Sequence, residues 1–124
     1  MKPTVVRGAT FAASLALVSP CAVAGPDCKA FENFSDIQGS RVLADLSEHV
    51  VIGKDRLYFH SSPYLNCRLR DVFILPGETV NAYVEFAGYT AVMYLNRKTG
   101  EDAVGWVESA RLRATGRGVA PHDQ

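Results

Sequence analysis

The sequence has few of the residues and motifs that mark enzymes, metal proteins and nucleic-acid binders. Its 124 residues include three cysteines, three histidines and one tryptophan, and basic and acidic residues balance at 13 each. Without a net positive field, the chain has no general attraction to nucleic acid or to an anionic membrane surface. We therefore expect no nucleic-acid partner.

Motifs for catalysis or cofactor binding are also missing. The chain has no G-x-S-x-G, no H-E-x-x-H, no phosphate-binding loop and no dinucleotide fingerprint. His49, His60 and His122 have no cysteine or carboxylate at the spacing of a metal site. The sequence thus predicts a non-enzymatic protein with no metal or other cofactor, and a hydrolase of unrecognised type is the enzymatic alternative.

What is present fits one small globular domain. Hydrophobic residues make up 48% of the chain and charged residues 21%, which is ordinary for a folded protein. Ten glycines and six prolines separate short runs of β-branched and aromatic residues. This pattern favours many turns and short strands, and hence an all-β fold.

Residues 1–24 are typical of a secretory signal peptide. A basic start with Lys2 and Arg7 precedes a short apolar stretch over residues 8–18, and Ala22-Val23-Ala24 forms an A-x-A cleavage site. We expect cleavage after Ala24, export to a bacterial periplasm or beyond, and no membrane span in the mature chain. A lipid anchor on Cys21 is a weaker alternative, because Pro20 stands where lipidation boxes have a small flexible residue.

Cleavage would change the charge and the cysteine count. Loss of Lys2 and Arg7 leaves 11 basic against 13 acidic residues, and two cysteines remain, Cys28 and Cys67. An even number of cysteines in an oxidising compartment predicts a disulfide. Closing a loop of about 40 residues would stabilise the fold by roughly 4 kcal/mol.

Hydrophobic periodicity places most of the strands. Residues 28–45 fit either a short helix or irregular turns, whereas the later chain alternates with a period of two. In the clearest strand, over 79–86, alternation places Val80, Ala82, Val84 and Phe86 inward. The other expected strands are 49–52, 56–60, 71–75, 89–95 and 103–108. Residues 109–112 fit one helical turn, and 114–124 should form a flexible tail.

Several segments resemble the bacterial SH3 domain family. Residues 57–63, Leu-Tyr-Phe-His-Ser-Ser-Pro, are similar to its opening Leu-Asn-Val-Arg-Ser-Gly-Pro. Residues 76–80 and 88–92 resemble later strands, and residues 105–112 resemble the closing Gly-Trp-Val-x-x-x-x-Leu. The chain departs from the family at Tyr89, which replaces a tryptophan, at His60, which replaces an arginine, and at Cys67 in the first long loop.

The resemblance implies an SH3-like barrel of five to six short strands over residues 47–113. Residues 25–46 would be an N-terminal extension tied to it by the disulfide. It also implies a cell-wall peptide or a periplasmic protein as ligand. The alternative is a periplasmic immunity or inhibitor protein that blocks a toxin or hydrolase.

Polar-tipped aromatic rings are the candidate binding residues. Six such rings are more than one small core would bury, and tyrosine and tryptophan are common on recognition surfaces. We expect Tyr58, Tyr64 and Tyr89 to flank a shallow groove together with Trp106. The competing interpretation is that these rings plug the ends of the barrel.

Overall fold

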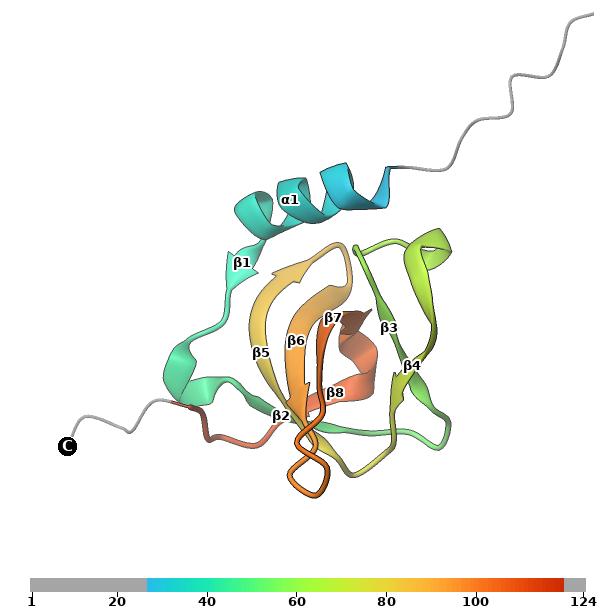
Figure 1. Cartoon of the computed structure of the whole chain (residues 1–124). Helices are drawn as coiled ribbons and strands as arrows, with labels where there is room; N and C mark the ends of the chain where they lie inside the picture. The colour runs from blue at the N-terminus through green and yellow to red at the C-terminus, as the bar shows by residue number, and fades with distance from the viewer. Residues whose placement is uncertain (1–26, 120–124) are drawn as a thin grey trace, which may run out of the picture.

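The computed structural model describes residues 27–119, and these residues form a mostly β protein with one short α-helix (Figure 1). The expected signal peptide with its cleavage site, and residues 120–124 of the expected tail, lie outside the described residues. The elements in chain order are α1 (Cys28–Gln38), β1 (Ser40–Arg41), η1 (Ala44–Leu46), β2 (Glu48–Val51), β3 (Leu57–His60), η2 (Leu65–Cys67), β4 (Arg68–Ile74), β5 (Thr79–Phe86), β6 (Tyr89–Leu95), β7 (Asp102–Glu108), η3 (Ser109–Arg111) and β8 (Leu112–Ala114).

The strands form one curled antiparallel sheet that closes about half of a barrel. Its order is β4-β3-β7-β6-β5-β2-β8, and β1 also pairs with β5, with Ser40 opposite Glu85. Six of these strands lie where periodicity placed them. The two others, β1 and β8, have only two and three residues, and they form because β5 and β2 offer them partners.

The concave side of the sheet holds the main hydrophobic core. Its buried side chains come from six different strands: Val51, Leu57, Phe59, Ile74, Val80, Ala82, Val92 and Val107. Each such side chain stabilises the fold by about 1.5–3 kcal/mol when it leaves water. Gly105 lets β7 approach β3, because a Cβ there would lie 2.9 Å from the carbonyl oxygen of His60.

A β-bulge in β5 sends part of that strand to the opposite face. Ala82 pairs with Val92, but Val84 pairs with Ala91, so one extra residue intervenes on β5. Because neighbouring residues of a strand point to opposite faces, Val84 lies on the convex side. Val84 is fully buried, as an inward residue should be, but it and Phe86 pack against the α1 side of the sheet and not in the main core.

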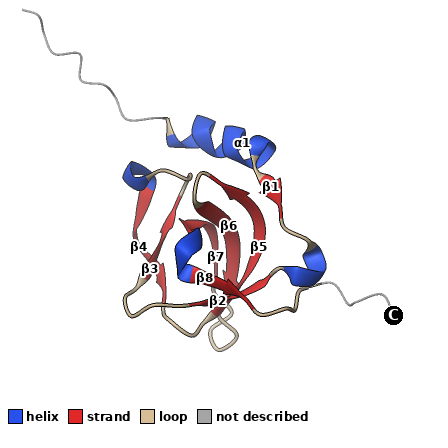
Figure 2. Cartoon of the chain, turned by 180° about the vertical axis from the view of Figure 1, so that it is seen from behind, coloured by secondary structure: helices blue, strands red, loops and turns tan. Residues whose placement is uncertain are grey.

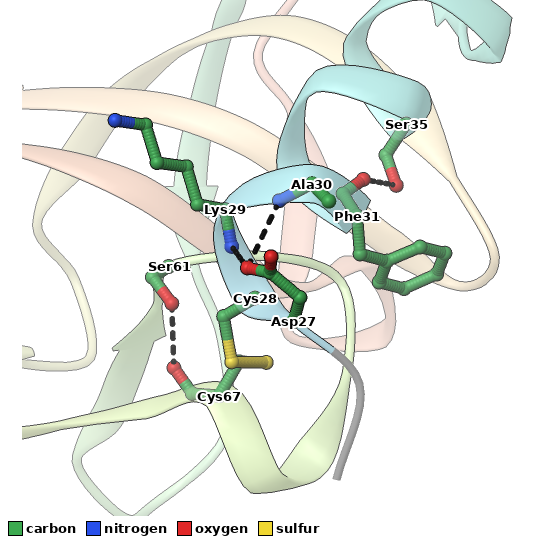
Figure 3. The surroundings of a disulfide bond; sticks show 8 residues. All are labelled: Asp27, Cys28, Lys29, Ala30, Phe31, Ser35, Ser61 and Cys67. Atoms are coloured by element: carbon green, nitrogen blue, oxygen red, sulfur yellow. Dashed lines mark hydrogen bonds between the residues drawn. A yellow bond between two sulfur atoms is a disulfide. The ribbon is translucent and has the colours of Figure 1, made fainter. Parts of the chain in front are cut away.

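Helix α1 lies across one end of the sheet, beside the turn between β5 and β6 (Figures 1 and 2). The carboxylate of Asp27 caps it by accepting hydrogen bonds from the backbone N–H groups of Lys29 (3.1 Å) and Ala30 (3.3 Å). Figure 3 shows this cap next to the disulfide between Cys28 and Cys67, which confirms the predicted bond. The sequence allows either a helix or irregular turns over residues 28–45, and the helix is correct for residues 28–38.

The C-terminal segment has secondary structure to Ala114 and hydrogen bonds as far as Val119. Residues 109–111 form the predicted helical turn, as a 3-10 helix. Strand β8 then runs to Ala114, the hydroxyl of Thr115 bonds to a carboxylate oxygen of Glu48 (2.9 Å), and the N–H of Val119 donates to Ser47 Oγ (3.2 Å). Residues 114–119 of the expected tail therefore include the end of β8 and hydrogen bonds to Ser47 and Glu48.

Candidate functional site

The predicted binding residues do not form one groove: Tyr58 and Tyr64 have different neighbours, whereas Tyr89 and Trp106 both lie next to His60. The Tyr58 ring on β3 contacts the Phe73 ring on β4 with centroids 5.8 Å apart, and the Arg68 guanidinium lies 3.6 Å from the Tyr58 centroid. Tyr64, which is 40% exposed, instead meets the edge of Phe31 on α1 at 6.5 Å.

Tyr89 and Trp106 both neighbour His60, and Trp106 also lines a hollow with residues of α1. The Tyr89 ring stands edge-on to His60 at 5.1 Å, and burial together with the nearby Glu108 charge raises the pKa of the Tyr89 phenol. Trp106 is only 3% exposed and pairs with His60 on one side and Ala91 on the other. Four hollows lie on the surface of the described residues. None of these four is lined by more than one of the predicted binding residues.

A hollow of about 420 Å³ is lined by residues of α1 and β1 on one side and of β5, β6 and β7 on the other. We call it the helix–sheet hollow. Ala91, Gly105 and Trp106 are among its lining residues from the sheet. Its remaining lining residues are Glu32, Asn33, Asp36, Arg41, Tyr83 and Val104.

The helical wall of this hollow carries negative charge. Glu32 and Asp36 are four residues apart on α1, so their side chains share one face of the helix. Asp36 lies 3.7 Å from Arg41, but both side chains are more than half exposed, and such pairs contribute little. Glu32 has no basic partner within 4.0 Å in the described part of the chain.

The sheet side supplies aromatic and apolar surface. The β5 bulge falls at Tyr83, whose side chain is 39% exposed beside the hollow, and Val104 on β7 is 65% exposed. Carboxylates next to indole and phenol rings are the surroundings that an ammonium or guanidinium group prefers. The helix–sheet hollow is therefore suited to a positively charged group on an otherwise apolar ligand.

The other hollows are less suited to one compact ligand. One of about 350 Å³ lies near the ends of β4 and β6 and is acidic, with Asp71, Glu78, Glu101 and Asp102. There the Tyr94 hydroxyl donates to Glu78 (2.6 Å), and this bond raises the pKa of the phenol. Across residues 27–119, no three His, Cys, Asp or Glu side chains are placed to hold a metal ion. A third hollow, of about 250 Å³, lies beside Tyr58, and a fourth, of about 220 Å³, borders Glu48 and Arg97.

His60 is buried, and it does not form a nucleophile–base pair with Cys67. Its Nδ1 lies 3.2 Å from the backbone oxygen of Trp106, so Nδ1 carries the proton and donates it. Its Nε2 and the Ser62 hydroxyl are buried without a hydrogen-bond partner in the described chain. The nearby Cys67 sulfur is bonded to Cys28 and is not available as a thiolate.

Periodicity missed Glu32, Asn33 and Asp36 as lining residues. Asp36 follows Glu32 and Asn33 by about one helical turn, and this spacing indicates a shared face only once residues 28–38 are known to be helical. Tyr83 is visible in the sequence as an outward ring of its strand, but the bulge that aims it at the hollow is not.

Comparison with models of known protein families, with curated protein sequences and with solved structures found no match to this chain. Between residues 27 and 119, no helix has both the length and the apolar character needed to cross a membrane.

Proposed function

We propose that this protein is an exported, non-enzymatic SH3-like binding module that holds a positively charged group in the helix–sheet hollow. The observation that carries the proposal is the meeting of Glu32 and Asp36 on α1 with Trp106 and Tyr83 on the sheet. Two carboxylates and two aromatic rings around one hollow recognise a cation through charge and through the ring faces.

Export is supported by the disulfide, since such bonds persist in oxidising compartments. The SH3-like assignment is supported by the resemblance of residues 57–63 and 105–112 and by the curled sheet that contains them. The resemblance implies a cell-wall peptide or a periplasmic protein as ligand. The carboxylates of the hollow favour such a ligand with a free amino group, or with an exposed lysine or arginine.

The test uses Trp106, which is the only tryptophan of the chain and therefore the only source of indole fluorescence. The purified protein is titrated with soluble peptides released from peptidoglycan, and with the same peptides after acetylation of their amino groups. We expect a saturable change in fluorescence with the free amines and a large loss of affinity after acetylation. Co-sedimentation with intact peptidoglycan provides a second readout.

A charge-neutralising pair of variants separates the site from general electrostatics. Glu32→Gln with Asp36→Asn removes both carboxylates from the hollow, whereas Glu101→Gln with Asp102→Asn removes the same charge at the acidic hollow. Only the first pair should weaken binding, by about tenfold or more. Equal binding by both pairs would refute the proposed site. Stoichiometric capture of a single exported toxin or hydrolase, without peptide binding, would identify an inhibitor instead.

A further inference from the structure

A second surface, on β3 and β4, combines arginines with aromatic rings. The Arg56 guanidinium lies 4.3 Å from the centroid of Phe73, that ring contacts Tyr58, and Arg68 lies 3.6 Å from the Tyr58 centroid. We call these four residues the arginine–aromatic ladder. Stacking on a ring holds a guanidinium in place and leaves its N–H groups directed outward along its edge.

An irregularity in β4 puts the ladder on the outside of the molecule. Leu69 and Val72 are three residues apart, yet both pack against the core. Asp71 between them has a φ of 60°, and this left-handed residue shifts the alternation by one position. Arg68, Arg70 and Phe73 consequently share the outer face.

These arginines have few competing partners. Arg56, Arg68 and Arg70 make no ion pair within 4.0 Å in the described part of the chain. Asp71 is the one acidic residue that lines the same hollow as Tyr58, Arg68 and Arg70. Around Tyr58 the arginines therefore outnumber the carboxylates, whereas at Phe73 the surface borders the acidic hollow with Glu78, Glu101 and Asp102.

Strand β4 is also an edge of the sheet. It pairs with β3 alone, and the backbone of Leu69–Ile74 makes no hydrogen bond outside that pairing within residues 27–119. The N–H and C=O groups on its outer edge are therefore free to pair with another strand. Extended peptides bind many sheets in this way, with backbone bonds for affinity and side chains for specificity.

We propose that β4 docks an extended acidic segment of a partner protein, which adds to the sheet as a further strand. Carboxylates of that segment pair with the guanidinium groups of Arg68 and Arg70, and Arg56 extends the basic surface beyond Phe73. The charge of these arginines selects an acidic occupant, and the free edge selects an extended one. This surface involves none of the lining residues of the helix–sheet hollow.

The test uses the whole protein and a capped peptide of alternating glutamate and valine, about ten residues long to match a strand. Affinity is measured by calorimetry, and amide hydrogen exchange locates the contact. We expect saturable binding that weakens with added salt, new protection at the amides of Leu69–Ile74, and no binding by the glutamine–valine counterpart.

Two variants with equal loss of charge decide whether the ladder is responsible. Arg68→Gln with Arg70→Gln should weaken binding about tenfold, whereas Lys98→Gln with Arg113→Gln should change it by less than about twofold. Tyr58→Leu, which keeps apolar bulk and removes the stacking face, should weaken it about threefold.

Three results would overturn the proposal. They are equal binding by the two charge variants, equal binding of the glutamine peptide, and no new protection along β4. Heparin that binds as tightly as the acidic peptide without protecting β4 would show a general polyanion surface instead. Glu32→Gln with Asp36→Asn should leave peptide binding unchanged, so failure here and failure of the proposed function are distinguishable.

Discussion

Val84 on β5 occupies the space that a side chain at Gly39 would need. A Cβ on Gly39 would collide with the Val84 Cγ1 and would lie 2.8 Å from the backbone oxygens of Ser35 and Glu85. The φ of Gly39 is −71°, an ordinary value, so glycine is required here for space and not for backbone freedom. This contact fixes how closely the end of α1 approaches the sheet.

Gly39→Ala should therefore destabilise the protein by about 1–3 kcal/mol, the usual cost of overpacking. Urea unfolding followed by circular dichroism measures the loss. Gln38→Ala, one residue earlier at an exposed position, is the matched control and should leave stability nearly unchanged. Equal stability of the two variants would mean that α1 is free to shift away from β5.

Removal of the disulfide should lower stability by up to about 4 kcal/mol, because Cys28 and Cys67 close a loop with a sequence separation of 39. Cys28→Ser with Cys67→Ser tests this by thermal unfolding. Reduction of the wild-type protein should lower its melting temperature to that of the double variant. Reductant added to the double variant is the control. If it lowers the melting temperature of the variant as much as that of the wild type, the reagent and not the disulfide is responsible.

The turn between β5 and β6 offers a stabilising change. Ala87 has a φ of 51° and Gly88 a φ of 82°, and tight hairpin turns of this kind favour asparagine or glycine at the first position. Ala87→Asn or Ala87→Gly should stabilise the fold by about 0.5–1 kcal/mol. Ala87→Val should destabilise it, since a β-branched residue tolerates positive φ poorly. The opposite order in urea unfolding would exclude this turn conformation.

Glu48 should contribute to acid sensitivity. The hydrogen bond from Thr115 lowers the pKa of its carboxyl, and the Arg117 charge lowers it further, below the ordinary value of 4.5. The folded state holds the proton of the Glu48 carboxyl more weakly than the unfolded state does. The stabilisation by Glu48 is therefore complete above pH 4.5 and is lost as the pH falls through the lowered pKa. The free energy of unfolding of Glu48→Gln, measured with urea across this pH range, should fall less steeply toward low pH than that of the wild type. Parallel pH profiles would contradict this.

Sequence reasoning succeeded where one interaction dominates. Strong alternation located β5 and β6 at their observed bounds, and the cysteine count predicted the bond of Cys28 with Cys67. It failed where tertiary contacts decide the outcome. The bulge before Val84 reverses an alternation that looks regular in the sequence, and β8 forms only because β2 lies beside it.

The candidate site shows the same division. Residue type identified Trp106, but its position in one hollow with Glu32 and Asp36 depends on how α1 crosses the sheet, which periodicity in residues 28–45 does not decide. The carboxylates of Glu32 and Asp36 become a candidate site only because Tyr83 and Trp106 line the same hollow. The sequence therefore shows which aromatic residues are available, but it does not show which residues surround them.

The pairing of β5 with both β1 and β2 has a consequence for the order of folding. A chain synthesised from its N-terminus produces α1, β1 and β2 well before residues 79–86 exist to receive them. Whether the chain emerges from a ribosome or across a membrane, these early elements have no partner strand until β5 has followed them, so their native pairing forms late.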